Sequence, residues 1–289
     1  MAFLLSELFS YLSSAMKKTY FVVLLLFASF SLICAAEDGS AFQLHLLPAK
    51  KIVPSFSTNA RAHRTSIAKN FSSNVLTASF GGIFPLADVS LFNSKFQNSL
   101  GATVYNSLMN PENHLHVITT DFFVDWLFDV PITDLFIIRF GPGHSSQHLT
   151  DDAIEIYKEH SLNYAREYFQ LFGYYKLNAT NGFVYGGVYD NYSFKISSAV
   201  PNGYIFEFGG EAFSTRLNNQ LFAYTGLDIK YRSEVNYGAS QNYQIGIRYN
   251  GEAGNTTRIA LNYQTGFEER GQYYNQKIDV INVGLYLEY

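Results

Sequence analysis

One short segment of this sequence brings together residue types that can do chemistry. Residues 140–152 are Phe-Gly-Pro-Gly-His-Ser-Ser-Gln-His-Leu-Thr-Asp-Asp. His144 and Ser146 are two residues apart, so their side chains share one face if the segment is a strand. Serine and histidine are residue types of nucleophilic and general-base catalysis. Asp151 and Asp152 are hard oxygen ligands of the kind that hold Ca²⁺, the only cofactor that this segment suggests.

A second set of residues places charges of both signs on one face of an extended segment. Asp228, Lys230, Arg232 and Glu234 follow one another at every second position. Charges inside a barrel persist only if they are paired or hydrated. They either line a narrow pore and select a small polar solute, or form an ion-pair network that occludes the lumen, which we favour. The charged residues that we assign to a shared lumen are Arg139, Arg166, Asp228, Lys230, Arg232, Glu234, Arg248 and Arg258.

The elements that position both sets are predicted to be strands. After residue 54 the chain divides into short runs in which apolar and polar residues alternate, and an alternation of period two is typical of strands with two different faces. Turn residues separate these runs. The twelve predicted strands are 55–66, 75–86, 96–108, 115–130, 135–147, 162–176, 182–192, 203–214, 220–234, 238–250, 256–267 and 277–289.

The connections between these runs favour a membrane barrel. Short turns, such as 131–134, 178–181 and 251–255, alternate with longer loops, of which 148–161 is the longest. Outer-membrane barrels have short periplasmic turns and longer extracellular loops. A soluble barrel or sandwich with apolar residues inside is the alternative. We predict an all-β fold, a single antiparallel transmembrane β-barrel of about twelve strands.

The last strand supports this fold class. Ile281, Val283, Leu285, Leu287 and Tyr289 form one apolar row that ends on an aromatic residue. This pattern resembles the closing strand of bacterial outer-membrane barrels, which the barrel assembly machinery recognises. A barrel must pair its last strand with its first. We therefore expect the strand ending at Tyr289 to pair with residues 55–66 and to contact the assembly machinery.

Composition excludes several classes of protein. Aromatic residues make up 17% of the chain, with 22 Tyr and 26 Phe, and charged residues only 15%. The charged fraction lies below the roughly 25% usual for soluble domains. A net charge of −4 without a basic stripe gives no indication of nucleic-acid binding.

The amino terminus predicts export. Lys17 and Lys18 precede an apolar run of residues 20–33, and Cys34-Ala-Ala36 follows. This is the pattern of a cleaved signal peptide, here residues 1–36 with an extended leader if translation begins at Met1 rather than Met16. Residues 37–54 are predicted to be a periplasmic lead-in, and residues 55–289 the barrel. The expected location is the outer membrane, where the partners are its lipids.

The motifs of the chain also resemble a known family. His-x-Ser-x-His-Leu at 144–149, Asn-Tyr-x-Arg-Glu at 163–167 and Gly-Gln-Tyr-Tyr at 271–274 are similar to those of an uncharacterised family of bacterial outer-membrane barrels. The resemblance covers most of the chain after residue 55. It implies a fold and a compartment, and no activity.

A weaker local resemblance implies an activity. Outer-membrane phospholipase A and the lipid A deacylases carry His-x-Ser on a strand, and the phospholipase adds an Asn on the next strand. By this resemblance Ser146 is the nucleophile, His144 the general base and Asn163 the residue that orients the imidazole, on the outward face near the outer leaflet.

We therefore expect an outer-membrane barrel of uncharacterised molecular function, with a charged and largely occluded lumen, rather than an enzyme. Two alternatives remain open from the residues alone. One is a lipid acyl-hydrolase that uses His144, Ser146 and Asn163. The other is a narrow pore for a small polar solute.

Overall fold

The computed structural model describes residues 42–91, 94–109, 115–179, 181–192, 203–216, 220–251 and 255–288. The predicted leader and the terminal Tyr289 lie outside these ranges. The chain divides into a large compact unit of residues 44–89 and 95–289 and a small unit of residues 1–43 and 90–94. All the sites described below lie in the large unit.

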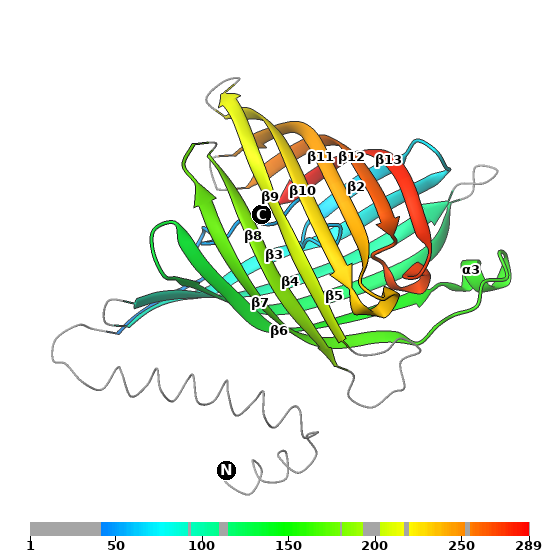
Figure 1. The fold of residues 1–289 in the computed structure, drawn as a ribbon, viewed down its shortest axis with the longest axis horizontal. Helices are drawn as coiled ribbons and strands as arrows, with labels where there is room; N and C mark the ends of the chain where they lie inside the picture. The colour runs from blue at the N-terminus through cyan, green and yellow to red at the C-terminus, as the bar shows by residue number, and fades with distance from the viewer. Residues whose placement is uncertain are drawn as a thin grey trace, which may run out of the picture. The chain divides into compact units, whose positions relative to one another are not determined.

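The large unit is a closed antiparallel β-barrel (Figure 1). Each strand pairs with its neighbour in the chain, and the last strand closes the barrel by pairing with the first, from Leu287 opposite Thr65 to Asn282 opposite Asn70. One further strand, β1 (Gln43–Leu46), lies outside the barrel beside β3. The barrel strands are β2 (Thr65–Asn70), β3 (Val75–Leu91), β4 (Ser94–Met109), β5 (His116–Pro131), β6 (Phe136–Leu149), β7 (Tyr164–Leu177), β8 (Gly182–Tyr192), β9 (Gly203–Arg216), β10 (Leu221–Arg232), β11 (Gly238–Asn250), β12 (Thr256–Phe267) and β13 (Lys277–Glu288).

The predicted fold class and strand count are confirmed. All twelve predicted runs overlap a barrel strand, the first only at Thr65 and Ser66, and residues 238–250 and 256–267 coincide with β11 and β12. The last strand closes the barrel as predicted, but its partner is residues 65–70, and of the predicted partner range 55–66 only Thr65 and Ser66 take part. No helix among the described residues is long and apolar enough to cross a membrane.

The first predicted strand, residues 55–66, is wrong. The barrel begins at Thr65, and residues 48–64, here called the inner segment, form no strand. Val53, Ser57 and Thr58 of this segment are at most 2% exposed. Residues 48–54, which the sequence assigns to a periplasmic lead-in, belong to this inner segment, and Ile52 and Val53 hydrogen-bond to wall residues that face the lumen.

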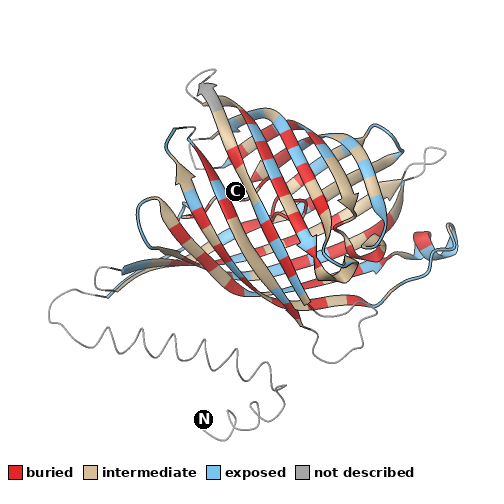
Figure 2. Ribbon diagram, viewed as in Figure 1, coloured by how far each residue is buried: buried red, intermediate tan, exposed pale blue. Residues whose placement is uncertain are grey.

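The two faces of the strands meet different surroundings, as the alternation predicts. In β12, Ile259 and Leu261 are 61% and 44% exposed on the outside, whereas Arg258 and Asn262 are 0% and 5% exposed on the inside. Figure 2 shows the same alternation of buried and exposed blocks along the strands. The apolar rows therefore form the outer surface, and polar side chains fill the lumen.

The two ends of the barrel differ. One end carries short turns, such as residues 132–135, and is called the turn end. The other, the loop end, carries α3 (Asp151–Glu155), η2 (Ser233–Val235) and η3 (Gly271–Tyr273). The alternation of short and long connections agrees with the prediction from sequence.

Gly141 in β6 permits a close approach that any side chain would prevent. A Cβ atom at this position would lie 1.8 Å from the backbone carbonyl oxygen of Trp126 in β5. That carbonyl belongs to the backbone of β5, which is paired with β4 at Trp126, so it has little freedom to move. At Gly173 in β7, by comparison, a Cβ would lie 3.1 Å from the ring of Phe136, a side chain that can turn.

We predict that Gly141→Ala destabilises the barrel by about 1–3 kcal/mol through overpacking, and that Gly173→Ala costs less. The measurement is the temperature at which the folded barrel loses its faster mobility in a detergent gel. Equal melting temperatures for the two variants would contradict this account of Gly141.

Candidate functional site

The inner segment lies inside the lumen, because it contacts strands on all sides of the barrel. Its backbone N–H at Ser57 donates to Glu211 of β9 at 3.0 Å, and the Asn59 amide donates to Glu207 at 2.8 Å. His63 Nε2 lies 2.6 Å from Asp125 Oδ2 of β5. Further contacts reach β4 through Gln97, β6 through Arg139 and β13 through Glu288.

The inner segment is anchored at the turn end by apolar packing. Phe56 stacks on Tyr185 with ring centroids 3.8 Å apart. Val53 is fully buried in a cluster with Ile137 and Phe172. These contacts bury apolar surface inside an otherwise polar lumen, so they favour the inserted position of the segment.

Lys230 of β10 is the central contact of the lumen. Its ammonium lies 2.6 Å from Asp228 Oδ1 on the same strand, 3.0 Å from Asn59 Oδ1 of the inner segment and 2.7 Å from Glu269 Oε2. The Lys230 side chain is 1% exposed. One buried cation therefore joins the barrel wall, the inner segment and the loop that carries Glu269.

That loop, residues 268–276 between β12 and β13, folds over the loop end and is called the mouth loop. The amide of Gln272 donates to the backbone carbonyls of Gln147 and Leu162 at 2.6 and 2.9 Å. Arg232 donates to the carbonyl of Tyr274 at 2.8 Å. Ties to β6, β10 and the start of β7 thus hold the mouth loop across the lumen.

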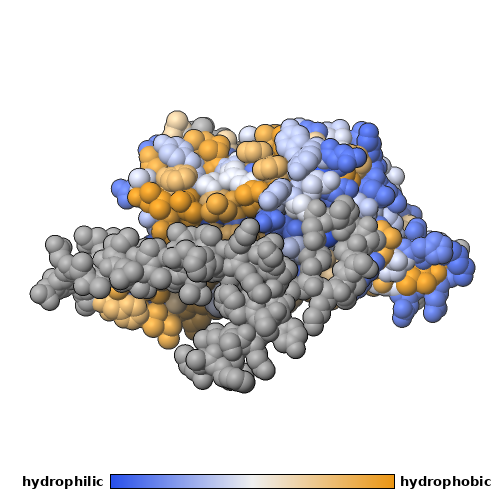
Figure 3. Space-filling view, turned by 60° about the horizontal axis from the view of Figure 1, so that its bottom comes forward, coloured by the Kyte–Doolittle hydropathy of each residue, from blue (hydrophilic) through white to orange (hydrophobic). Residues whose placement is uncertain are grey.

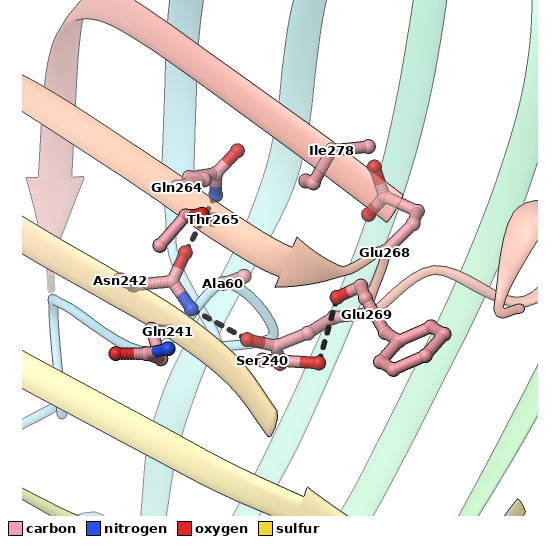
Figure 4. Close-up of a pocket in the computed structure, with 10 residues that line it drawn as sticks. Ala60, Ser240, Gln241, Asn242, Gln264, Thr265, Glu268, Glu269 and Ile278 are labelled. Carbon is pink, nitrogen blue, oxygen red and sulfur yellow. Dashed lines mark hydrogen bonds between the residues drawn. The ribbon is translucent and has the colours of Figure 1, made fainter. Parts of the chain in front are cut away.

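The mouth loop and the inner segment contact each other. Arg61 Nε donates to the backbone carbonyl of Glu269 at 2.9 Å. Figure 4 shows Ala60 of the inner segment beside Asn242 and Glu269, which line the same small pocket. The pocket holds about 10 Å³, room for no more than about one water molecule. The inner segment and the mouth loop, together called the two closures, therefore leave almost no space between them.

The eight charged residues predicted for the lumen all occur on its wall or rim, and most are joined in pairs. Arg139 donates to both carboxylate oxygens of Asp129, at 2.7 and 2.8 Å, and Arg258 Nη1 lies 2.7 Å from Glu211 Oε2. Arg248 donates to Asn250, within its own strand, at 2.6 Å. At the loop end, Glu234 of η2 accepts from Arg232 at 2.8 Å and lies 3.8 Å from Arg166.

A cluster around His63 was missed by the sequence analysis. His63 Nδ1 lies 3.0 Å from Thr103 Oγ1, and its partner Asp125 also accepts from Tyr168 and Gln170, each at 2.8 Å. The imidazole fits only because residue 101 is a glycine, where a Cβ would lie 2.4 Å from the ring. Since His63 was placed within a predicted strand, nothing in the periodicity indicated these partners.

The His-x-Ser segment lies at the loop end of β6, on the outer face. His144 is exposed and its Nδ1 lies 3.4 Å from Glu167 Oε1 of β7. Ser146 Oγ lies 2.6 Å from Nε2 of His148, whose ring packs edge-on against Phe122. The structure thus brings Ser146 together with the second histidine of the segment. Both histidines are two residues from Ser146, so the spacing alone could not choose between them.

Asn163 lies just before β7, which begins at Tyr164. Across the β6–β7 ladder, the residue paired with Ser146 is Ala165, and the residue paired with His144 is Glu167. The neighbouring strand therefore presents a carboxylate, rather than an amide, opposite His144.

The predicted metal ligands Asp151 and Asp152 lie at the start of α3. Asp152 Oδ2 accepts from the backbone N–H of Val117 at 3.1 Å and lies 3.5 Å from His116 Nδ1. These contacts tie the start of α3 to β5 through one oxygen of the Asp152 carboxylate. No group of three or more His, Cys, Asp or Glu residues suited to a metal ion occurs in the described ranges.

Comparison with known proteins gives a family without an assigned activity. A family model described as a protein of unknown function (DUF1207) matches residues 35–289. A search of curated protein sequences gave no match.

Among solved structures, the fold is similar to outer membrane phospholipase A from Escherichia coli, with 12% identity over 78% of this chain and 92% of that chain and a TM-score of 0.49. The calcium-bound outer membrane phospholipase dimer of Salmonella typhi has 12% identity over 88% and 94%, with a TM-score of 0.49. A NanC porin has 10% identity over 79% and 99%, with a TM-score of 0.44. None of these likenesses carries an argument about activity.

The charge of Glu269 makes the mouth loop sensitive to acid. Burial by itself would raise the pKa of the Glu269 carboxyl, but the charges of Lys230 and Arg61 outweigh it and lower the pKa from 4.5 to about 2. A carboxyl with a depressed pKa stabilises the folded state fully above its unfolded pKa and loses this contribution as the pH falls toward the folded pKa.

We predict that Glu269→Gln weakens hydrogen-exchange protection of residues 268–276 at pH 6, where wild-type Glu269 is charged. The difference between the two proteins should shrink as the pH falls from 4.5 to 2, because wild-type Glu269 then becomes neutral. A difference that stays constant over this range would contradict the ion pair with Lys230.

Proposed function

We propose a function from the structure, because the chain belongs to the DUF1207 family, whose description assigns none. The protein is an outer-membrane barrel whose lumen is closed by two segments of the same chain, the inner segment and the mouth loop. The observation that carries this proposal is the inner segment, which contacts carboxylates on widely separated strands of the lumen wall, Glu211 of β9, Asp125 of β5 and Glu288 of β13. The Lys230 ammonium then joins this segment to the mouth loop.

The apolar outer surface supports insertion in the outer membrane. Phe80, Ile245 and Ile259 are each more than 60% exposed on the outside of the strands. Figure 3 shows apolar side chains gathered on the visible outer face, with hydrophilic side chains toward the end that carries α3. A closed barrel satisfies its backbone hydrogen bonds internally, so it tolerates contact with lipid. Lipids and the assembly machinery, through residues 281–289, are the proposed partners.

The lumen of this barrel is filled rather than open. Wall residues at different heights, such as Gln97, Glu207 and Arg258, are each 0% exposed. An open pore of the porin type keeps such polar residues hydrated. Here they are instead bonded to the inner segment or to one another.

We predict that the purified wild-type protein inserts into planar bilayers without steady conductance, because the inner segment and the mouth loop close the lumen. An open porin in the same bilayer is the positive control. Steady conductance of the wild type at low voltage would overturn the closed barrel.

A second candidate function is a lipid acyl-hydrolase on the outer face. The observation that favours it is the 2.6 Å contact between Ser146 Oγ and His148 Nε2, a serine within reach of a base. The pair faces outward at the loop end, at the level of the proposed outer leaflet. Ser146 Oγ would attack an ester carbonyl of a lipid while His148 accepts its proton; the ester C–O bond would then break, the alcohol would leave with that proton, and water would release the fatty acid from Ser146.

We predict that, if the protein cleaves lipid esters, Ser146→Ala and His148→Ala each lower the rate at least about 100-fold. His144→Ala and Asn163→Ala test the alternative set in which His144 is the base. Ser145→Ala is the matched control, since Ser145 faces the lumen and is 2% exposed. A wild-type protein without turnover on phospholipid or lipid A in detergent would remove this candidate.

A further inference from the structure

The inner segment is basic, and the wall that receives it presents carboxylates. Residues 48–64 contain Lys50, Lys51, Arg61 and Arg64 and no Asp or Glu. The segment's hydrogen-bond donors meet acidic residues of the wall. These contacts are Ser57 with Glu211 and Glu288, Asn59 with Glu207, and His63 with Asp125.

We propose that the lumen is a gated path for small cationic solutes, and that the inner segment is its internal basic occupant. The proposal rests on the closed barrel proposed above and adds a substrate class. The inner segment presents N–H and O–H donors to the wall carboxylates and carries a net positive charge, as such a solute would.

The cation preference follows from which contacts the wall keeps when the segment leaves. Arg139 keeps Asp129 and Arg258 keeps Glu211, since these pairs lie within the wall. Asp125 loses His63 and keeps only the neutral donors Tyr168 and Gln170. Among the described contacts these two wall guanidiniums thus keep a carboxylate partner, whereas the Asp125 carboxylate is freed, and uncompensated carboxylates in a pore select cations.

Opening requires no strand to separate. The inner segment precedes β2, and the mouth loop connects β12 to β13, so both lie outside the strand ladders. Order–disorder changes in such segments are a common form of switching.

The two closures are coupled to each other. Asn59 of the inner segment and Glu269 of the mouth loop share the Lys230 ammonium, and Arg61 donates to the backbone of Glu269. Displacing either closure therefore weakens the hold on the other.

The experiment releases the inner segment without changing the wall. In the Asn59→Ala/Arg61→Ala variant, the segment loses its contacts with Glu207, Lys230 and Glu269. In planar bilayers across a tenfold KCl gradient, we expect this variant to conduct with at least a threefold preference for K⁺, and the wild type to stay silent. Adding Asp125→Asn to this variant should lower the preference, because it removes the freed carboxylate.

Lys69→Ala is the matched control, an exposed lysine of β2 whose ammonium donates to the backbone carbonyl of Ser73, and it should stay silent. Release of the inner segment is checked independently with a cysteine at position 57, where the wild-type serine is buried. Ser57→Cys should react with a charged maleimide only when it is combined with Asn59→Ala/Arg61→Ala, and should stay unreactive in the otherwise wild-type protein. If the double variant does not assemble, the conductance and K⁺ preference of the single Arg61→Ala variant are measured in the same way, with the same expected result.

A variant that assembles and stays silent contradicts the gated path, and so does one that conducts with anion preference. A wild type that already conducts steadily instead removes the closed barrel. A silent wild type with silent variants leaves the closed barrel standing and ends the proposal of a cation path.

Discussion

The buried ammonium of Lys230 is the interaction on which the interior of this barrel depends. A cation that is 1% exposed persists only if nearby oxygens replace its lost hydration. Asp228 supplies one from the wall, Asn59 one from the inner segment and Glu269 one from the mouth loop. The need to solvate one charge therefore holds together three parts of the chain that are far apart in sequence.

The filled lumen follows from the same constraint on a larger scale. Strands that face lipid outside must turn their polar rows inward, and a twelve-stranded barrel leaves space between those rows. Ion pairs such as Arg258 with Glu211 fill part of this space. The inner segment fills much of the remainder, where small wall residues such as Gly101 leave room for His63.

The barrel wall separates two chemistries that alternate along one strand. In β6, Ser145 and Gln147 are buried in the lumen, whereas Ser146 and His148 lie on the outer face. The mouth loop is bonded to the backbone of Gln147 through Gln272, so the inner closure and the outer serine share one strand. The closed lumen and the outward Ser146–His148 pair are nonetheless independent sites, because neither contacts the other's side chains in the described structure.

The barrel could be predicted from the sequence, because the two-residue period of a strand forces apolar and polar rows onto opposite faces. Strands such as 238–250 and 256–267, the inward charges and the outward His144 and Ser146 all follow from that local rule. The position of residues 55–64 in the lumen and the contact of Ser146 with His148 became visible only in the folded barrel. Those outcomes depend on contacts between distant residues, such as His63 with Asp125 and Asn59 with Lys230, which leave no period in the chain.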